Sequence, residues 1–339
     1  MGDITIKDVA REANVSIATV SRVINKNYVV SSDLEQKVVL AIEKLNYVPN
    51  SIARSLKNDN THTIGLIVSD ISNGFFTTIA RAAEDLLMQK GYNLIVCSTD
   101  NQQEKEASYL QLLMEKKVDG IILNTTGENT PFISSISKSI PIALCSRKVD
   151  SPQFKGDFVE SDNIPGSFEL TCHLLHLGHR RIAIINGQPN VSSSKERLQG
   201  FTQAMETVGI TVDSSYPYLF NGNFSEVSTG YDGIEKLMKM EEPPTAVIAM
   251  NNELAIGVLK YCHTNHVLIP ENLSVCSFGG IENMDILYVQ PSYVSVVPAG
   301  IGRRLAELLI ERIECKNNLP NREIRFTTQL IEGNGVRAI

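Results

Sequence analysis

The sequence predicts a small all-α domain followed by an α/β domain of two lobes, each built on a parallel sheet. Three observations lead to this fold class. The 339 residues, 42% of them hydrophobic, exceed the size of one compact core. Residues 1–48 show only the period of amphipathic helices. From residue 62 onward, short apolar runs alternate with helical stretches. We therefore expect domains at 1–48 and 62–339, joined by a segment over 49–61.

The N-terminal residues predict two short helices joined by a tight turn. In TIKDVAREA (5–13), Thr5 can cap a helix whose apolar residues recur at i, i+3, i+4 and i+7. After a turn at Asn14 and Val15, Ser16 can cap a second helix, IATVSRVIN. This spacing is typical of a helix-turn-helix. A third helix should begin with a capping box formed by Ser32 and Glu35.

The second helix has an outward face suited to DNA. Val20, Val23 and Ile24 share the packing face, so the opposite face could enter a major groove. Arg22 suits guanine, Ile17 and Ala18 suit thymine methyl groups, and hydroxyls suit phosphates. The predicted DNA contacts in this domain are Thr5, Ser16, Ile17, Ala18, Thr19, Ser21, Arg22 and Asn25. A three-helix structural or protein-binding module is the alternative.

The stretch NSIARSLKND (50–59) predicts a helix of about two turns capped by Asn50. A helix that short is marginal alone, so it should form only against a partner. Ile52, Ala53 and Leu56 would suit the identical helix of a second copy, and Leu56 could wedge between base steps in a minor groove. An interdomain linker is the alternative.

Charge, cysteines and targeting signals narrow the class of protein. The net charge of −7 does not itself indicate nucleic-acid binding, since the first 60 residues hold eight Lys/Arg against seven Asp/Glu. The N-terminus is charged, and no apolar run approaches the roughly 18 residues of a membrane span, so we expect a cytoplasmic protein that contacts no membrane. Six scattered cysteines without a CxxC pair predict buried thiols rather than disulfides or a zinc site.

From residue 62 the chain alternates between strands and helices in two sets. The first set has the strands HTIGLIVSD, YNLIVCST, VDGIILNT and IPIALCS, with helices near 75–90 and 103–117. The second has RRIAIING, YLFNG, TAVIAMN and LSVCSFGG, with helices near 194–208, 225–240 and 252–266. Such alternation favours parallel sheets with right-handed crossovers. Two sets predict two similar lobes with a ligand cleft between them.

Enzymatic motifs are missing from the sequence. It contains no GxSxG elbow and no P-loop, and AGIGRR (299–304) keeps only two glycines of a dinucleotide fingerprint. The histidines His173, His176 and His179 have metal-ligand spacing, but Gly178 interrupts them at an expected helix end. We therefore expect neither an enzyme nor a cofactor or metal.

Three stretches carry a family resemblance: KDVAREANVSIATVSRVIN, then YVPNSIARSLK, then TIGLIVSDISNGFF. In this order and spacing, the chain resembles the LacI/GalR (lactose-repressor) family of bacterial transcription regulators over nearly its whole length. The resemblance implies a periplasmic-binding-protein-like effector domain and a homodimer on a pseudo-palindromic DNA operator. It places Ile17, Ala18 and Arg22 in the major groove and Asn50, Ala53 and Leu56 in a hinge helix.

The resemblance also implies three chain crossings between the lobes. The first lobe would comprise about 62–162 and 291–322, and the second about 163–290 and 323–339. The implied switch is a change in lobe angle that decides whether two hinge helices pair. A DNA-binding repressor of a carbohydrate-utilisation operon follows as the expected function. A solute-binding protein of the same fold is the alternative.

The same resemblance assigns effector contacts in the cleft. Phe75 and Phe76 match its aromatic position, Ser193 and Arg197 match ligand contacts, Phe224 matches a stacking ring, and Asn251 matches an amide contact. The phenylalanines could instead belong to the core, and Arg197 could be a surface charge.

Departures from the family pattern suggest the effector class. Ser146 stands beside Arg147 where an Asp is common, Asn252 replaces another Asp, and Gly279 stands at a third such position. Because a carboxylate would repel an anion, their absence favours a sugar acid or sugar phosphate, paired with arginine, over a neutral sugar. Alternatively, Asn252 caps a helix and Gly279 makes room for a bulkier ligand.

Overall fold

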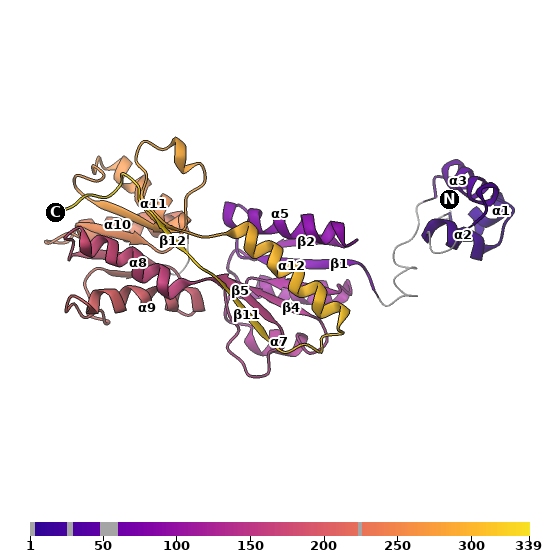
Figure 1. Ribbon diagram of the computed structural model, residues 1–339, viewed down its shortest axis with the longest axis horizontal. Coiled ribbons are helices and arrows are strands. Elements are labelled where there is room, and N and C mark those ends of the chain that lie inside the picture. Colours follow the sequence, from indigo (N-terminus) through magenta and orange to yellow (C-terminus); the bar gives the residue numbers. More distant parts are fainter. Residues whose placement is uncertain (1–3, 26–29, 48–59, 223–225) are drawn as a thin grey trace. The chain divides into compact units, whose positions relative to one another are not determined.

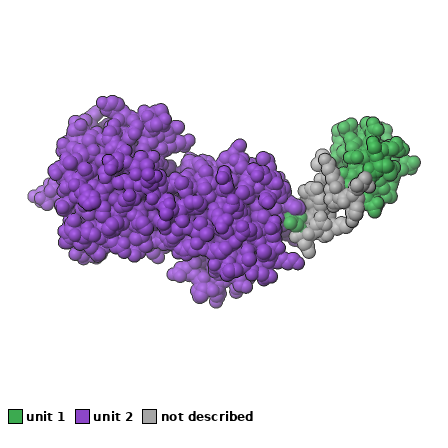
Figure 2. Space-filling view, in the orientation of Figure 1, with its two compact units in different colours: residues 1–61 green, residues 62–339 purple. Residues whose placement is uncertain are grey.

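The computed structural model describes residues 4–25, 30–47, 60–222 and 226–339. Two compact units, Met1–Thr61 and His62–Ile339, divide the chain (Figure 2). Among the described residues, no helix is long and apolar enough to cross a membrane. Four cysteines are buried and Cys172 is half-buried, but Cys315 is exposed, so the expectation of a buried thiol is wrong there.

The first unit contains the helices α1 (Ile6–Glu12), α2 (Ile17–Asn25) and α3 (Ser32–Leu45). Their buried side chains meet in one small core made of Val9, Ala10, Ala13, Val20, Val38 and Ala41. Thr5 precedes α1. The backbone N and the Oγ1 of Thr5 donate hydrogen bonds to the Asp8 carboxylate, at 2.9 and 2.6 Å. This contact fixes the start of α1.

The predicted capping box of α3 is wrong. Ser31, not Ser32, is the cap residue, with extended backbone angles, and its side chain makes no capping hydrogen bond. Ser32 is already helical, which moves Glu35 out of the reciprocal position. Asp33 and Glu35 lie instead in the first turn, where the helix dipole favours negative charge.

The first lobe of the second unit is built on a parallel sheet with strand order β11-β5-β4-β3-β1-β2 (Figure 1). Its strands are β1 (Thr63–Val68), β2 (Asn93–Ser98), β3 (Gly120–Leu123), β4 (Ile142–Cys145), β5 (Asp157–Ser161) and β11 (Arg322–Phe326). Two apolar clusters cover its faces. One includes α5 (Gly74–Gln89) and α12 (Pro298–Glu314), and the other includes α6 (Gln103–Glu115) and α7 (Thr130–Ile136).

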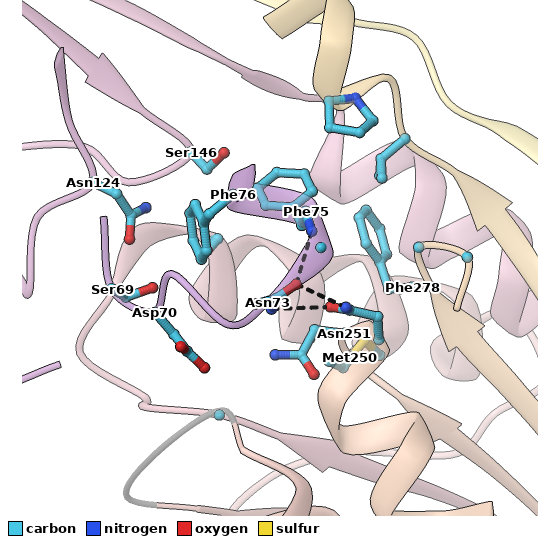
Figure 3. Close-up of a pocket in the computed structure, with 18 of the residues that line it drawn as sticks. Ser69, Asp70, Asn73, Phe75, Phe76, Asn124, Ser146, Met250, Asn251 and Phe278 are labelled. Atoms are coloured by element: carbon cyan, nitrogen blue, oxygen red, sulfur yellow. Dashed lines mark hydrogen bonds between the residues drawn. The ribbon is translucent and has the colours of Figure 1, made fainter. Parts of the chain in front are cut away.

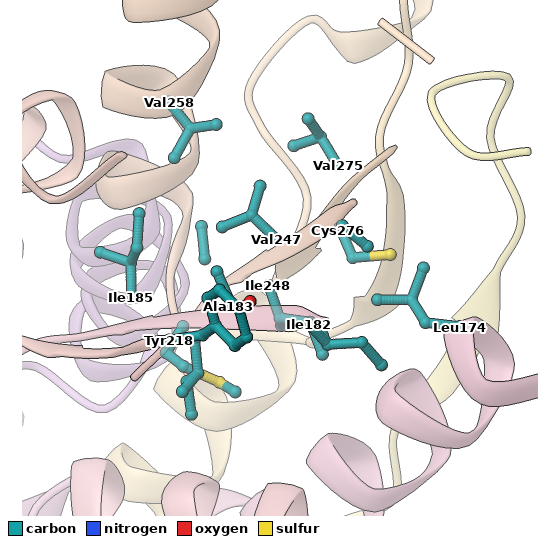
Figure 4. Close-up of a cluster of buried hydrophobic side chains, with 14 of the residues drawn as sticks. Leu174, Ile182, Ala183, Ile185, Tyr218, Val247, Ile248, Val258, Val275 and Cys276 are labelled. Carbon is teal, nitrogen blue, oxygen red and sulfur yellow. The ribbon is translucent and has the colours of Figure 1, made fainter. Parts of the chain in front are cut away.

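The second lobe has the sheet order β12-β10-β9-β8-β6-β7, parallel except for β12. Its strands are β6 (Ile182–Asn186), β7 (Leu219–Asn221), β8 (Ala246–Ala249), β9 (Ser274–Phe278), β10 (Ser292–Ser295) and β12 (Gln329–Ile331). Its helices are α8 (Asn163–His176), α9 (Ser192–Glu206), α10 (Val227–Met238), α11 (Asn252–Thr264) and the short η1 (Met284–Ile286). Figure 4 shows the buried side chains between sheet and helices, including Leu174, Ile248 and Val258.

The chain crosses between the two sheets after β5, after β10 and after β11. The sequence placed the last two crossings at about 291 and 322, which is several residues too early. Val294 of β10 still pairs with Phe278 of the second sheet, and Phe326 of β11 pairs with Ser161 of the first. The strands therefore extend to the crossings themselves, where composition alone gives no boundary.

A buried ion pair joins α12 to the edge of the first sheet. Arg312 and Asp157 are both fully buried, with Nε–Oδ2 and Nη2–Oδ1 distances of 3.0 and 2.7 Å. Arg322 adds a second cation at 2.9 Å from Oδ2. Burial alone would raise the pKa of Asp157, but hydrogen bonds from Arg322 and Arg312 outweigh it and hold the pKa below 3.8.

Replacing Arg312 by methionine should lower the free energy of unfolding by about 3 kcal/mol, because it leaves a buried carboxylate with one partner fewer. Urea denaturation at pH 7 measures this. The depressed pKa means that the contribution is present above pH 3.8 and is lost as the pH falls through the folded-state pKa, so the difference should shrink in acid. Arg303→Met, at an exposed site on α12, is the control and should change stability little.

Candidate functional site

Helix α2 of the first unit presents the side chains predicted to read DNA. Ile17 is 45% exposed, and Ala18 and Arg22 are exposed as well. Val20 is fully buried and fixes the opposite face in the core. The exposed residues thus lie on a helix held by its packing, an arrangement that suits insertion into a groove.

The predicted phosphate-binding hydroxyls also hold the helix starts. Ser16 Oγ accepts from the backbone N of Thr19 at 3.1 Å and lies 2.9 Å from Thr19 Oγ1. Ser21 is half-buried, and Thr5 donates its hydroxyl to Asp8. The predicted contacts Asn50, Ala53 and Leu56, and the side chain of Asn25, lie outside the described residues.

Within the second unit, a cavity of about 640 Å³ lies where the carboxyl ends of the two sheets face each other (Figure 3). Residues of both lobes line it, as expected for an open α/β sheet. The structure brings together these predicted effector contacts: Phe75, Phe76, Ser146, Arg147, Ser193, Arg197, Asn251 and Gly279. Phe224 lies outside the described residues.

Aromatic rings from both lobes form part of the wall. Phe75 and Phe76 lie in the first turn of α5 with centroids 5.1 Å apart, edge to face. Phe76 is only 8% exposed and belongs to the core of the first lobe, so it serves both core and cavity. Phe278, at the end of β9, lines the cavity from the second lobe. Figure 3 shows Phe75 and Phe278 on neighbouring sides of the cavity.

Arg197, on α9, is held from three sides. Its Nε donates to Asn163 Oδ1 at 2.9 Å, and its Nη1 donates to the backbone oxygen of Met250. Its guanidinium carbon lies 4.0 Å from the centroid of the Phe278 ring, a cation–π contact. The guanidinium is therefore fixed in orientation before any ligand binds.

Arg147 brings a second guanidinium to the cavity from the first lobe. It is 7% exposed, and its Nη1 donates to Asn101 Oδ1 at 3.0 Å and to the backbone oxygen of Thr125 at 3.1 Å. Burial lowers the pKa of both arginines to about 10, so both remain cations at neutral pH. The charge of Arg147 also lowers the pKa of Arg197, which means that the two cations repel each other.

Neither cavity arginine has a direct ionic partner in the described part of the chain. Among the described residues, no carboxylate forms a salt bridge with Arg147 or Arg197, and their acceptors named above are neutral. Carboxylates favour these charges only through space: the buried Glu106 acts on Arg147, and Glu160 and Glu196 act on Arg197. Two buried cations with neutral acceptors form a site that an anion would stabilise.

Carboxylates also line the cavity, which sequence reasoning did not anticipate. They are Asp70, Asp100, Glu226 and Glu282. Asp100 pairs with Lys105, and Glu226 and Glu282 are exposed, so these three lie at the rim. Asp70 is half-buried and accepts from the backbone N and Oγ of Ser72. The negative charges therefore lie toward solvent, and the arginine charges lie deeper.

Two of the positions without the family carboxylate have left-handed backbone. Ser146 has φ +58° and Gly279 has φ +95°, each directly after a strand. A Cβ on Gly279 would meet only Val296 Cγ2, at 3.6 Å, so the backbone rather than space favours glycine there. An Asp tolerates the φ of Ser146, so the serine is not required by conformation.

The adjacent asparagines Asn251 and Asn252 have different roles. Asn251 caps α11, its Oδ1 accepting from the Leu254 backbone N at 2.7 Å. Asn252 reaches across the cleft: its Nδ2 donates to Asn73 Oδ1 at 2.9 Å, and Asn73 Nδ2 lies 3.5 Å from Asn252 Oδ1. The interpretation of Asn252 as the helix cap is therefore wrong, and Asn252 links the lobes.

Sequence reasoning missed several further lining residues. Asn124 and Asn186 are each 1% exposed, and the Oδ1 atom of each is without a hydrogen-bond partner in the described part of the chain. Both stand at the carboxyl end of a strand, β3 and β6, which is the signal that could have found them. Phe278 could have been found in the same way.

The histidine series does not gather around a metal site. His179 Nδ1 contacts Thr245 Oγ1 at 2.9 Å, and its Nε2 contacts the backbone oxygen of Arg337 at 3.0 Å. The described residues contain no cluster of three metal-ligating side chains.

Family models match both units. The model described as "Bacterial regulatory proteins, lacI family" matches residues 5–50. The model described as "Periplasmic binding proteins and sugar binding domain of LacI family" matches residues 61–333.

The chain is also similar to transcriptional regulators among characterised proteins and solved structures. An HTH-type transcriptional repressor PurR of Aliivibrio salmonicida is 33% identical, with 93% of each chain covered, and one of Haemophilus influenzae is 33% identical over 99% of each. A solved regulator CelR–cellobiose complex has 25% identity and a TM-score of 0.73, covering 98% of this chain and 99% of that one. A LacI-family regulator from Enterococcus faecium with bound ribose has 26% identity and a TM-score of 0.71, covering 82% and 99%.

The amide bridge between Asn73 and Asn252 should appear as coupling in a double-mutant cycle. Each single alanine variant and the double variant would be compared by chemical denaturation. Asn73→Ala should lower the free energy of unfolding more than Asn252→Ala does, because Asn73 Oδ1 also caps α5 by accepting a hydrogen bond from Phe75 N. The coupling energy should be about 0.5–1.5 kcal/mol. Asn251→Ala, which removes the α11 cap but leaves the bridge in place, should be additive with Asn73→Ala. Equal additivity in both cycles would contradict the bridge.

Proposed function

Because the chain belongs to the LacI family of bacterial regulatory proteins, we propose which of its residues bind operator DNA and what class of effector controls it. It is a DNA-binding repressor with a small-molecule effector domain. The finer assignments below rest on the exposed face of α2 and on the two arginines of the cavity. A homodimer would place two first units on the half-sites of a pseudo-palindromic operator in bacterial cytoplasm.

Helix α2 is the recognition element. Its exposed Arg22 suits a bidentate contact with guanine, and Ile17 and Ala18 suit thymine methyl groups. Phosphates or flanking groups would then be contacted by Thr5, Ser16, Thr19, Ser21 and Asn25. Asn50, Ala53 and Leu56 would form the hinge helix, in which Leu56 widens the minor groove.

The effector is an anion that also carries hydroxyls, such as a sugar acid or a sugar phosphate. The observation that carries this proposal is the pair of buried guanidiniums, Arg147 and Arg197, neither of which forms a salt bridge with a described carboxylate. An anion between them would relieve their repulsion and form charge-assisted hydrogen bonds. The unpartnered oxygens of Asn124 and Asn186 suit hydroxyl donors.

A neutral sugar is the second candidate. Cellobiose and ribose are named with two of the similar regulators, and the half-buried carboxylate of Asp70 could accept hydroxyl hydrogen bonds. A neutral sugar would leave the repulsion between Arg147 and Arg197 in place, which is why we rank it below an anion. With either ligand, the regulated genes would belong to carbohydrate utilisation.

The switch follows from the lobe connections. A ligand that contacts both lobes changes their relative angle, and that angle determines whether the segments over 50–59 of two chains can pair over the operator. Effector and operator affinities are then coupled, and the coupling is reciprocal.

Arg22→Ala should remove sequence preference, since a bidentate contact with guanine discriminates by about 1–3 kcal/mol per base pair. An operator selected from a palindromic library would be compared with a scrambled duplex by fluorescence anisotropy at fixed salt. Specific binding should fall toward the non-specific level. Lys37→Ala, at an exposed residue of α3 paired with Asp33, is the control and should keep the preference. Unchanged discrimination by Arg22→Ala would contradict the assignment of α2.

Calorimetric titration should distinguish the two effector classes. We expect gluconate or a sugar phosphate to bind more tightly than the matching neutral sugar. Ser146→Asp should weaken binding of the anion roughly tenfold or more, because a carboxylate about 4 Å from the anion repels it by roughly 1–4 kcal/mol. Ser146→Asn is the matched control of equal shape without charge. Tight binding of neutral sugars alone, unaffected by Ser146→Asp, would refute the anionic class.

A further inference from the structure

Arg197 is oriented by a side chain at the first crossing between the lobes. Asn163 is the first residue of α8, separated from the end of β5 by Asp162 alone, and is 1% exposed. Its Oδ1 accepts from Arg197 Nε at 2.9 Å. Its Nδ2 donates to Glu160 Oε2 at 2.6 Å and to Glu196 Oε2 at 3.0 Å. Since a guanidinium can only donate, the amide oxygen must face Arg197 and the amide nitrogen must face the carboxyls.

This cluster joins both lobes. Arg325, on β11 of the first lobe, forms a bidentate pair with Glu196 of α9 in the second, at 3.0 and 2.8 Å. Its Nη2 also lies 2.8 Å from Glu160 Oε1, but that oxygen has no well-aligned hydrogen bond in the described residues. The backbone N of Asp162 donates to Phe326 O at 2.8 Å, which places the first and third crossings side by side.

Glu160 is the unusual member of the cluster. Its side chain is 1% exposed. The charged groups facing it are Glu196 and Arg197 from α9, Arg325 from β11 and Lys148 from the loop after β4, and the Cys145 thiol of β4 is also close. Burial, and then the charge of Glu196, raise the pKa of Glu160 to about 8, although Arg325 and Lys148 lower it. Glu196 stays ionised, because hydrogen bonds from Arg325 and Asn163 outweigh its burial and lower its pKa.

We propose that Asn163 is the positioning residue for Arg197, and that the charge of the Glu160 carboxyl behind it sets how strongly this arginine holds an anion. The proposal rests on the anionic effector proposed above. When Glu160 is neutral, no charge on its carboxyl offsets the attraction between Arg197 and the anion. When Glu160 loses its proton, a buried negative charge opposes the ligand. Linkage requires the converse, so that a bound anion favours the protonated carboxyl.

Inorganic sulfate tests this, because its charge is constant between pH 6.5 and 9. Calorimetric titrations of the full-length chain would compare wild type, Glu160→Gln and Glu323→Gln at both pH values, with Arg197→Ala defining binding in the cavity. Wild type should bind sulfate on the order of tenfold more weakly at pH 9. Glu160→Gln should bind equally at both values, near the wild-type affinity at pH 6.5.

Glu323→Gln is the matched control, since Glu323 lies on β11 near Lys148 and Arg325 but is ionised throughout. It should retain the pH dependence of wild type. A pH-independent wild type, or an equal pH dependence in Glu160→Gln, would overturn the role of Glu160.

Asn163→Leu, of similar size but without an acceptor, should lose most of the sulfate affinity at pH 6.5, and wild-type affinity in this variant would overturn the positioning role. If it fails to fold, Glu160→Gln still decides the charge effect. Failure of the anionic-effector proposal would be distinct: sulfate would then show no binding that depends on Arg197 at either pH. Sulfate that binds through Arg197 but independently of pH would contradict only the role of Glu160.

Discussion

Two sheets, parallel except for β12, face one cavity with the carboxyl ends of their parallel strands, and the chain crosses between the sheets three times. This constraint determines most of what the effector domain can do. The crossings connect the lobes, and a ligand between the strand ends contacts both of them, so in the proposed switch it would control the angle between the lobes. The crossings also bring Asn163, at the start of α8, close to the residues that leave β11.

The electrostatics of the cavity follow from the same geometry. Arg147 enters from the first lobe and Arg197 from the second, so the lobe closure of the proposed switch would bring like charges toward one another. A ligand of opposite charge, as proposed, would convert this repulsion into attraction and thereby favour one lobe arrangement. The amide bridge between Asn73 and Asn252 favours contact between the lobes without adding charge. Asp at position 252 would have placed a carboxylate at this point.

Local patterns were sufficient to predict most of the architecture. Hydrophobic periodicity gave the helices of the first unit and the alternation of the second, because each signal lies within one element. The rule that ligands lie beyond strand ends, together with the family resemblance, gathered Ser146, Asn251 and Gly279 around one cavity. The cap of α3 was misplaced by one residue, because consecutive serines at 31 and 32 offer two similar starts.

Contacts between residues far apart in sequence could not be predicted in this way. No periodicity relates Asn163 to Arg197, or Glu196 to Arg325, since each pair meets only after both sheets have formed. The same reason explains why Asn252 was interpreted as a cap when its partner lies 179 positions away. The positions of the last two crossings depend on the pairing of β10 and β11, which apolar composition alone does not specify.

Effector binding in this cavity and operator binding by the first unit are coupled, so each ligand changes the affinity of the protein for the other. The most direct test measures four affinities: effector with and without saturating operator, and operator with and without saturating effector. The two ratios should be equal and should differ from one, typically by 5- to 150-fold. An effector that binds in the cavity with the same affinity whether or not operator is present would contradict this coupling.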